Sequence, residues 1–86
     1  MYYVYILQSE KSGQWYTGST GNLRKRVSQH NLGQSTWTKG GVPWKLIYYE
    51  ACLSEEDARA REMYLKTGAG KKYLKNRLTR FLSVTG

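Results

Sequence analysis

The first strand of this chain constrains its fold more than any other feature, because residues 2–8 are hydrophobic on both alternating sets. The segment reads YYVYILQ and lacks the polar alternation of a strand with one side in solvent. Such a strand is buried on both faces, so a layer must cover each side of its sheet. With 86 residues the chain has room for one core, and we expect a single domain over residues 1–86.

Turn and cap signals predict the elements that follow this strand. The predicted elements are a strand at 14–19, a helix at 23–31, a strand at 43–51 and helices at 55–66 and 70–82. Asn22 and Ser54 are the expected N-caps of the first two helices, and a basic, Gly-rich loop occupies residues 32–42. The order ββαβαα predicts the α/β class, with a small three-stranded, mainly antiparallel sheet flanked by helices.

The length of the first hairpin loop predicts how its tyrosines pair. If residues 9–12 form a four-residue loop, Gln8 pairs with Gly13. This register sets Tyr5 directly opposite Tyr16, with both side chains on one face of the sheet.

Positive charge dominates the composition. Fourteen Lys and Arg residues face six Asp and Glu residues, for a net charge of +8, which is more than the solubility of a small domain requires. Nucleic acid is the commonest partner of such a field, and an acidic membrane surface is the second. No predicted helix has a broad apolar face on one side and a wholly basic face on the other. The sequence therefore disfavours binding to a membrane surface. With one cysteine and no secretion signal, we expect a cytoplasmic protein.

The first helix directs charged side chains toward the protein body. On a helical wheel Leu23 and Val27 define the inward stripe, Arg26 and His30 fall beside it, and residues 24–25 rotate away. Burial of a guanidinium requires a partner or a wet cleft. The alternative is that Arg26 extends past the edge of the stripe into water.

The second helix carries an inward carboxylate. Ala58 and Leu65 mark its buried stripe, and Glu62 lies between them. The alternative for Glu62 is a surface salt bridge with Lys66, one turn later. Together with the tyrosines, the arginine and the histidine, this carboxylate completes what phosphodiester cleavage requires: a ligand for a divalent ion, a cation for the phosphate and groups that orient water.

These segments resemble the motifs of the GIY-YIG nuclease family. Tyr3-Val4-Tyr5 is similar to its first element, Tyr16-Thr17-Gly18 to its second, residues 18–31 to its helix signature and residues 58–66 to its Glu-bearing helix. The resemblance covers essentially the whole chain, with nothing appended, and is to the short standalone members known from bacteria. Tyr3 departs from the family pattern, because it replaces the first Gly, and we expect it to fill that space or narrow the cleft.

The resemblance implies an endonuclease that acts on nucleic acid, expected to be DNA, with one Mg²⁺ or Mn²⁺ ion. The implied catalytic residues are Tyr5 as the general base, Tyr16 as a group that positions water and metal, Arg26 on the phosphate, His30 in proton handling or positioning, and Glu62 as the metal ligand. The family also carries a late asparagine, for which Asn76 is the candidate.

The substrate surface is expected to combine the loop at 32–42 with the basic C-terminal helix. The candidate nucleic-acid contacts are Lys39, Lys66, Lys71, Lys72, Lys75 and Arg77. Trp37 could stack on an unpaired base or anchor the loop by packing. Two other functions stay open: a nucleic-acid-binding module that cuts nothing, and a cutting subunit that depends on a partner protein for its substrate.

Overall fold

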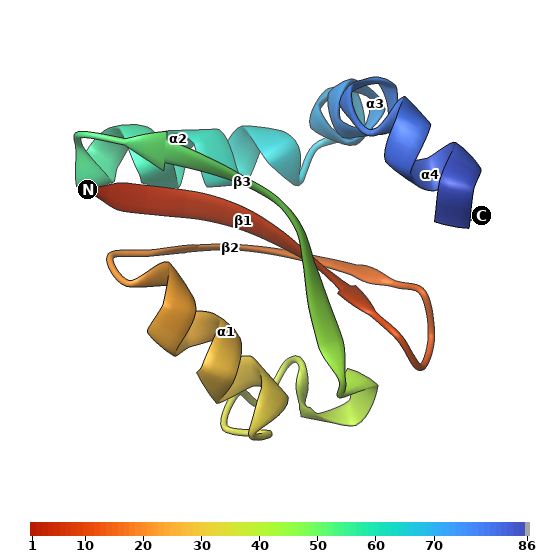
Figure 1. Cartoon of the computed structure of the whole chain (residues 1–86). Coiled ribbons are helices and arrows are strands. Elements are labelled where there is room, and N and C mark those ends of the chain that lie inside the picture. The colour runs from red at the N-terminus through yellow and green to blue at the C-terminus, as the bar shows by residue number, and fades with distance from the viewer. Residues whose placement is uncertain (86) are drawn as a thin grey trace.

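A computed structural model describes residues 1–85 as a three-stranded antiparallel sheet with helices on both faces (Figure 1). The strands are β1 (Tyr2–Ser9), β2 (Trp15–Thr20) and β3 (Trp44–Cys52). The helices are α1 (Leu23–Asn31), the short 3₁₀ helix η1 (Lys39–Gly41), α2 (Glu55–Leu65), α3 (Gly68–Arg77) and α4 (Thr79–Thr85). The strand order β2-β1-β3 confirms the predicted fold class.

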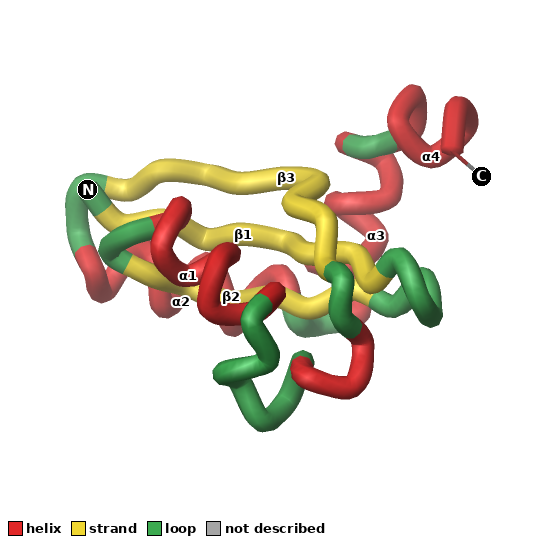
Figure 2. The backbone as a smooth tube through the Cα atoms, turned by 60° about the horizontal axis from the view of Figure 1, so that its bottom comes forward, coloured by secondary structure: helices red, strands yellow, loops and turns green. Residues whose placement is uncertain are grey.

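Strand β1 lies in the middle of the sheet and is buried on both faces, as its sequence predicts (Figure 2). Val4 and Ile6 pack against Ala58, Leu65 and Leu74 of α2 and α3. The intervening side chains of β1 pack on the opposite face, where α1 lies. Each side chain from position 4 to position 7 is at most 1% exposed.

The first two long helices begin at the predicted caps. The Asn22 side chain accepts a hydrogen bond from the Lys25 amide at 3.1 Å, and the Ser54 hydroxyl accepts one from the Asp57 amide at 3.3 Å. These bonds satisfy amides that have no partner within the helix. Within residues 1–85, no helix has the length and apolar character that a membrane crossing requires.

The predicted hairpin register is wrong by two residues. Gln8 pairs with Trp15 and Tyr5 pairs with Gly18, so Tyr16 lies diagonally from Tyr5 on the same face. The cause is Ser9, which stays in the strand and whose hydroxyl accepts hydrogen bonds from the amides of residues 11 and 12. The loop therefore begins one residue later than predicted, and this moves the pairing by two positions without changing the face.

The single helix predicted at residues 70–82 is two helices, which meet at Leu78. The Thr79 hydroxyl donates hydrogen bonds to the carbonyls of Lys75, at 3.1 Å, and Asn76, at 2.8 Å. A threonine that binds the carbonyls of the preceding turn competes with the helical amides. Leu78 adopts a non-helical conformation there, and α4 sets off in a different direction (Figure 1).

Candidate active site

Gly18 allows the side chain of Tyr5 to reach the edge of the sheet. The two residues are paired across β1 and β2, and β2 is an edge strand. A Cβ atom at Gly18 would lie 2.5 Å from the Tyr5 hydroxyl oxygen, closer than carbon and oxygen approach. The missing side chain thus lets a buried phenol extend across β2, with its hydroxyl near the β2 edge.

A chain of buried hydrogen bonds holds the Tyr5 hydroxyl. The Tyr5 hydroxyl oxygen lies 2.8 Å from Nε2 of His30, and Nδ1 of His30 lies 2.7 Å from the Thr38 hydroxyl. The indole of Trp44 in turn donates to the Thr38 carbonyl at 2.7 Å. Because all four residues are buried, the loop at 32–42 and both its flanking elements fix the position of the phenol.

Tyr5 and His30 are both neutral at pH 7. Burial, followed by the neighbouring Tyr16, raises the pKa of Tyr5 to about 12. Burial, followed by the Arg26 guanidinium, lowers the pKa of His30 to about 4. The neutral imidazole therefore donates from one ring nitrogen and accepts at the other, and the Tyr5 and Thr38 hydroxyls supply the complementary roles.

Tyr16 joins the cluster through its ring. Its centroid lies 5.0 Å from that of His30 and 6.4 Å from that of Tyr5. Trp44 lies edge-on at 6.5 Å. The structure thus brings the two motif tyrosines together although they are not directly opposite each other.

Arg26 lies half-buried beside these rings. Its guanidinium donates to the Gln29 side chain at 3.1 Å, and its positive charge lowers the pKa of both Tyr5 and His30. No carboxylate within residues 1–85 forms a salt bridge with it. A cation without an acidic partner beside a cleft is suited to bind a phosphate.

Glu62 reaches the same edge of the sheet from the opposite face. One carboxylate oxygen accepts a hydrogen bond from the Ser19 hydroxyl of β2 at 2.5 Å, and the other lies 2.8 Å from Nζ of Lys66. The negative charge of Glu62 raises the pKa of Tyr5, so the carboxylate acts on the phenol across the β2 edge. The sequence offered two alternatives for Glu62, an inward position and a salt bridge with Lys66. The structure has both.

The donor groups fit a single, weakly held divalent ion. Across the described chain, no three His, Cys, Asp or Glu side chains gather in one place, so a protein-only cage is absent there. One carboxylate at a polar edge, with Ser19 beside it, matches the preference of Mg²⁺ for few protein ligands, several waters and a substrate phosphate. The residues therefore fit one ion at Glu62.

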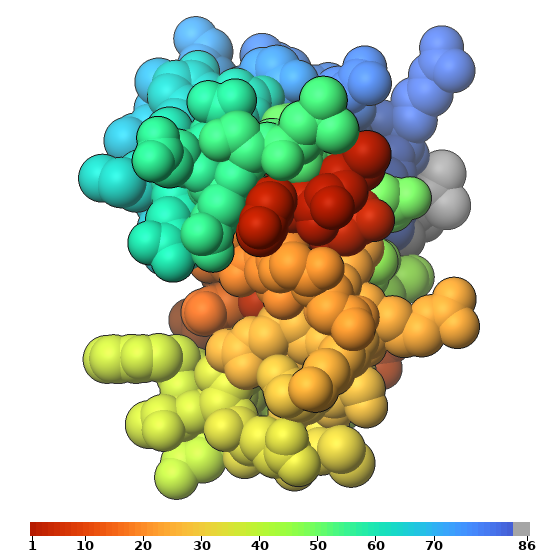
Figure 3. All heavy atoms as spheres, turned by 90° about the vertical axis from the view of Figure 1, so that its left-hand side faces the viewer, coloured from red at the N-terminus to blue at the C-terminus, as the bar shows by residue number. Residues whose placement is uncertain are grey.

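The surface is hollowed beside the site. Figure 3 shows a recess between α2, in green to cyan, and the yellow-green loop that follows α1. On the α2 and α3 side of β2, Lys71 and Lys75 line a cavity of about 310 Å³ together with Trp15 and Thr17. Basic side chains therefore continue along β2 from the position of Glu62.

The other predicted contact residues are exposed but not gathered at one place. The exposed set is Lys39, Lys66, Lys72, Asn76 and Arg77. The positive charge of Arg77 lowers the pKa of Glu50 on β3, which places Arg77 toward the other edge of the sheet. Trp37 is 87% exposed, so it does not anchor its loop by packing.

Three residues of the site were not among the site residues predicted from the sequence. Thr38 and Ser19 hold His30 and Glu62, and Gly18 makes room for Tyr5. Gly18 stood in the second motif, and the register could have indicated it. No local pattern marks Thr38 or Ser19, because their partners lie 8 and 43 residues away.

Comparisons with known proteins identify the family of this chain. The model of the GIY-YIG catalytic domain matches residues 1–81, and this chain therefore belongs to the GIY-YIG family. Membership of the family implies nuclease-type activity on nucleic acid.

Within the family, the chain is similar to UPF0213 proteins. A Clostridium perfringens member is 45% identical over 67 residues, 77% of this chain and 71% of the relative. One from Staphylococcus saprophyticus is 37% identical over 75 residues, 86% of this chain and 90% of the relative. The solution NMR structure of a UPF0213 protein from Bacillus halodurans covers 88% of this chain and 84% of its own, with a TM-score of 0.54 and 34% identity.

Proposed function

We propose that this chain is a metal-dependent endonuclease that hydrolyses phosphodiester bonds, with DNA as the expected substrate. One observation carries the proposal: the Tyr5 hydroxyl reaches Gly18 of β2, and the Glu62 carboxylate accepts a hydrogen bond from Ser19, the next residue of the same strand. Tyr5, Arg26 and Glu62 come from β1, α1 and α2, and the Tyr5 and Glu62 side chains both reach β2. A base, a phosphate-binding cation and a metal ligand are the groups that hydrolysis of a phosphodiester requires.

In this proposal Tyr5 first loses its own proton to solvent, and the phenolate oxygen then removes the proton from the attacking water. Its raised pKa keeps it protonated at rest, so ionisation must be favoured once substrate and metal are in place. The Arg26 charge already lowers the pKa, whereas Glu62 raises it. Neutral His30 orients the phenol through Nε2, and Tyr16 positions the water beside it.

Glu62 would hold one Mg²⁺ or Mn²⁺ ion, which would withdraw charge from a phosphate oxygen and offset the carboxylate charge near Tyr5. Ser19 orients one oxygen of Glu62 by its hydrogen bond, as neighbouring donors do for ligand carboxylates. Lys66 neutralises the other oxygen at rest. Arg26 would bind the phosphate and stabilise the charge that develops during attack.

The basic residues along β2 would hold the substrate strand. Lys66 lies beside Glu62, Lys71 and Lys75 line the cavity next to Trp15 and Thr17 of β2, and Lys39 and Trp37 would contact the strand from the loop. Lys72, Asn76 and Arg77 would contact more distant phosphates or none. Each phosphate contact that forms makes the affinity fall with salt, because bound counterions are released.

The test is incubation with supercoiled plasmid, branched DNA and single-stranded RNA, with Mg²⁺ or Mn²⁺ and with EDTA. We expect metal-dependent nicking that Glu62→Ala and Tyr5→Phe abolish, while both variants still bind DNA. Glu56→Ala is the matched control, because it removes an exposed acid from the same helix and should cut at the wild-type rate.

Three other outcomes would argue against the proposal. Wild-type cleavage by Glu62→Ala would contradict the role of the carboxylate. Binding without any cutting would favour a silent nucleic-acid-binding module. Slow, indiscriminate cutting that becomes selective on addition of a second protein would favour a cutting subunit that depends on a partner.

A further inference from the structure

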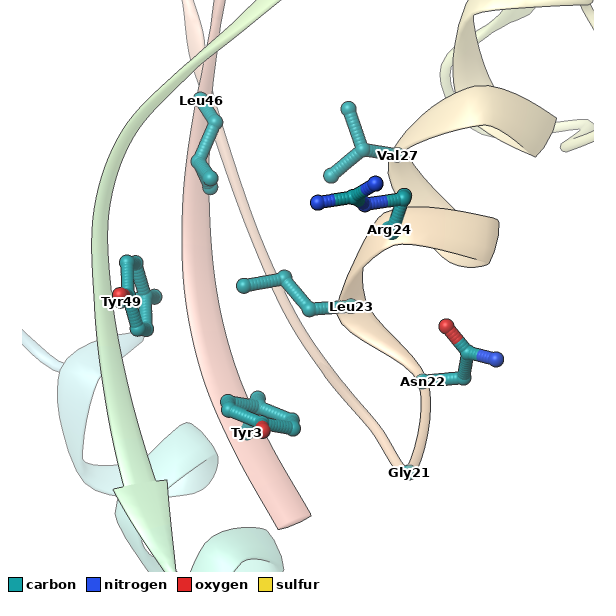
Figure 4. Close-up of a pocket in the computed structure, with 8 residues that line it drawn as sticks. All are labelled: Tyr3, Gly21, Asn22, Leu23, Arg24, Val27, Leu46 and Tyr49. Carbon is teal, nitrogen blue, oxygen red and sulfur yellow. The ribbon is translucent and has the colours of Figure 1, made fainter. Parts of the chain in front are cut away.

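A cavity of the described chain lies outside the active site. It measures about 570 Å³ and opens between α1 and the β3 half of the sheet (Figure 4). Its lining residues are Tyr3, Gly21, Asn22, Leu23, Arg24, Val27, Leu46 and Tyr49. None of these is a catalytic candidate: His30 contacts Tyr5 and Thr38, and Glu62 contacts Ser19 and Lys66.

Two tyrosines form the aromatic wall of this pocket. Tyr3, which replaces the first Gly of the family motif, lines this pocket, and its ring packs edge-on against Tyr49, with centroids 6.2 Å apart. Tyr49 is 55% exposed although it lies on the face that α1 covers. Helix α1 therefore leaves the aromatic part of β3 uncovered.

The rest of the lining is apolar, with a cation at the rim. Leu23, Val27 and Leu46 form an apolar floor, and Arg24 extends from α1 over the pocket, as Figure 4 shows. Arg24 is the only charged lining residue, and no acidic side chain within residues 1–85 forms a salt bridge with it. The pocket thus offers a flat apolar surface next to an uncompensated positive charge.

We propose that this pocket binds one unpaired nucleotide of a nucleic-acid strand, with its base against Tyr49 and Tyr3 and its phosphate on Arg24. Aromatic side chains on a sheet stack bases that are splayed out of a helix, and arginine binds phosphate. The volume is in the range of pockets for molecules of nucleotide size. The inference rests on the proposed function for the choice of nucleic acid over another anion, which the net charge of +8 also favours.

The two sites lie on opposite flanks of α1, so the strand bound in this pocket need not be the strand that is cut. Arg24 and Val27 line the pocket, whereas His30, on the other flank of the helix, contacts Tyr5 and lies near Arg26. A substrate with a single-stranded arm beside a duplex could occupy both. The pocket would then select junctions and flaps over uninterrupted duplex.

The test is fluorescence anisotropy in EDTA with a labelled single-stranded DNA oligonucleotide, the same sequence as a duplex, and adenosine monophosphate as a competitor. We expect Tyr49→Leu, which fills space without an aromatic face, to weaken single-strand binding about 10-fold. Arg24→Gln should weaken it as well, and Tyr49→Phe should bind like the wild type. Lys25→Gln is the matched control, since it removes the neighbouring charge on the exposed side of α1.

Single-strand binding that is unchanged in both Tyr49→Leu and Arg24→Gln would overturn the proposal. Equal losses on the duplex would also overturn it, because no unpaired base would then be recognised. If the monophosphate binds as tightly as the strand, the pocket serves free nucleotides and the strand assignment is wrong. Nicking is measured separately, so a chain that binds through the pocket without cutting contradicts only the proposed function.

Discussion

Because the imidazole of His30 is buried and neutral, we expect the free energy of unfolding to depend on pH between about 4 and 6.5. The ordinary pKa of histidine, 6.5, applies to His30 in the unfolded chain. In the folded chain, burial and the Arg26 charge lower the His30 pKa to about 4. As the pH falls below 6.5, His30 binds a proton in the unfolded chain but remains neutral in the folded chain. Stability is therefore complete above pH 6.5 and is lost progressively as the pH falls toward about 4.

The magnitude follows from the separation of the two pKa values. At about 1.4 kcal/mol for each pKa unit, the complete loss is about 3 kcal/mol, of which about 2 kcal/mol falls between pH 7.5 and pH 5. This is a substantial part of the stability of a small domain, which is about 5–15 kcal/mol. Most carboxylates titrate below this window, with model values near about 4.

Urea unfolding at a series of pH values, followed by tryptophan fluorescence, measures this dependence. His30→Gln should remove most of the slope between pH 7.5 and pH 5, because glutamine does not titrate. His30 is the only histidine of the chain, so the NMR signal of its ring reports its protonation without ambiguity. Equal slopes in the wild type and in His30→Gln, or a folded-state midpoint near about 6.5, would refute the reasoning.

Three further predictions concern other residues of the fold and the site. Gly18→Ala should displace Tyr5, lower the free energy of unfolding by about 1–3 kcal/mol and abolish nicking; wild-type activity and stability would contradict the close approach. Cleavage at saturating Mg²⁺ should increase with pH from neutral into the alkaline range, because the Tyr5 pKa is raised, and a flat pH–rate profile would exclude this base. Glu50→Gln should cost about 1–3 kcal/mol in urea unfolding, since both oxygens of the half-buried Glu50 accept hydrogen bonds from Arg61; an unchanged midpoint would mean the pair contributes nothing.

Short-range patterns predicted most of the fold. The two caps and the stripe of Ala58 and Leu65 gave the starts and faces of the helices, because these features depend on neighbours within one or two turns. The double-sided hydrophobicity of β1 predicted a central strand with a layer on each face. The break at Leu78 was missed, since it depends on where one threonine hydroxyl donates its hydrogen bond.

The sequence predicted which side chains lean inward but not where they meet. A helical wheel contains no information about the strand that packs beside the helix. The contact between Glu62 and Ser19 could therefore not be predicted. The partner of His30 is Thr38, in a loop whose path no periodicity describes. An error of two residues in the strand register leaves each side chain on the correct face of the sheet but changes the residue opposite it. Tyr5 was therefore predicted opposite Tyr16, whereas it pairs with Gly18.

Glu62 illustrates why a stability role and a chemical role need not exclude each other. A lone carboxylate at a half-buried edge costs desolvation energy unless donors satisfy it, and Ser19 and Lys66 supply them. The same contacts fix the carboxylate at the position from which its charge acts on Tyr5. A divalent ion would compete with Lys66 for the carboxylate, and the exposed lysine can move its charge into solvent. In the proposed function this salt bridge would hold the Glu62 carboxylate in place before an ion binds. Lys66→Met should therefore leave the fold intact while changing the metal concentration that half-saturates cleavage.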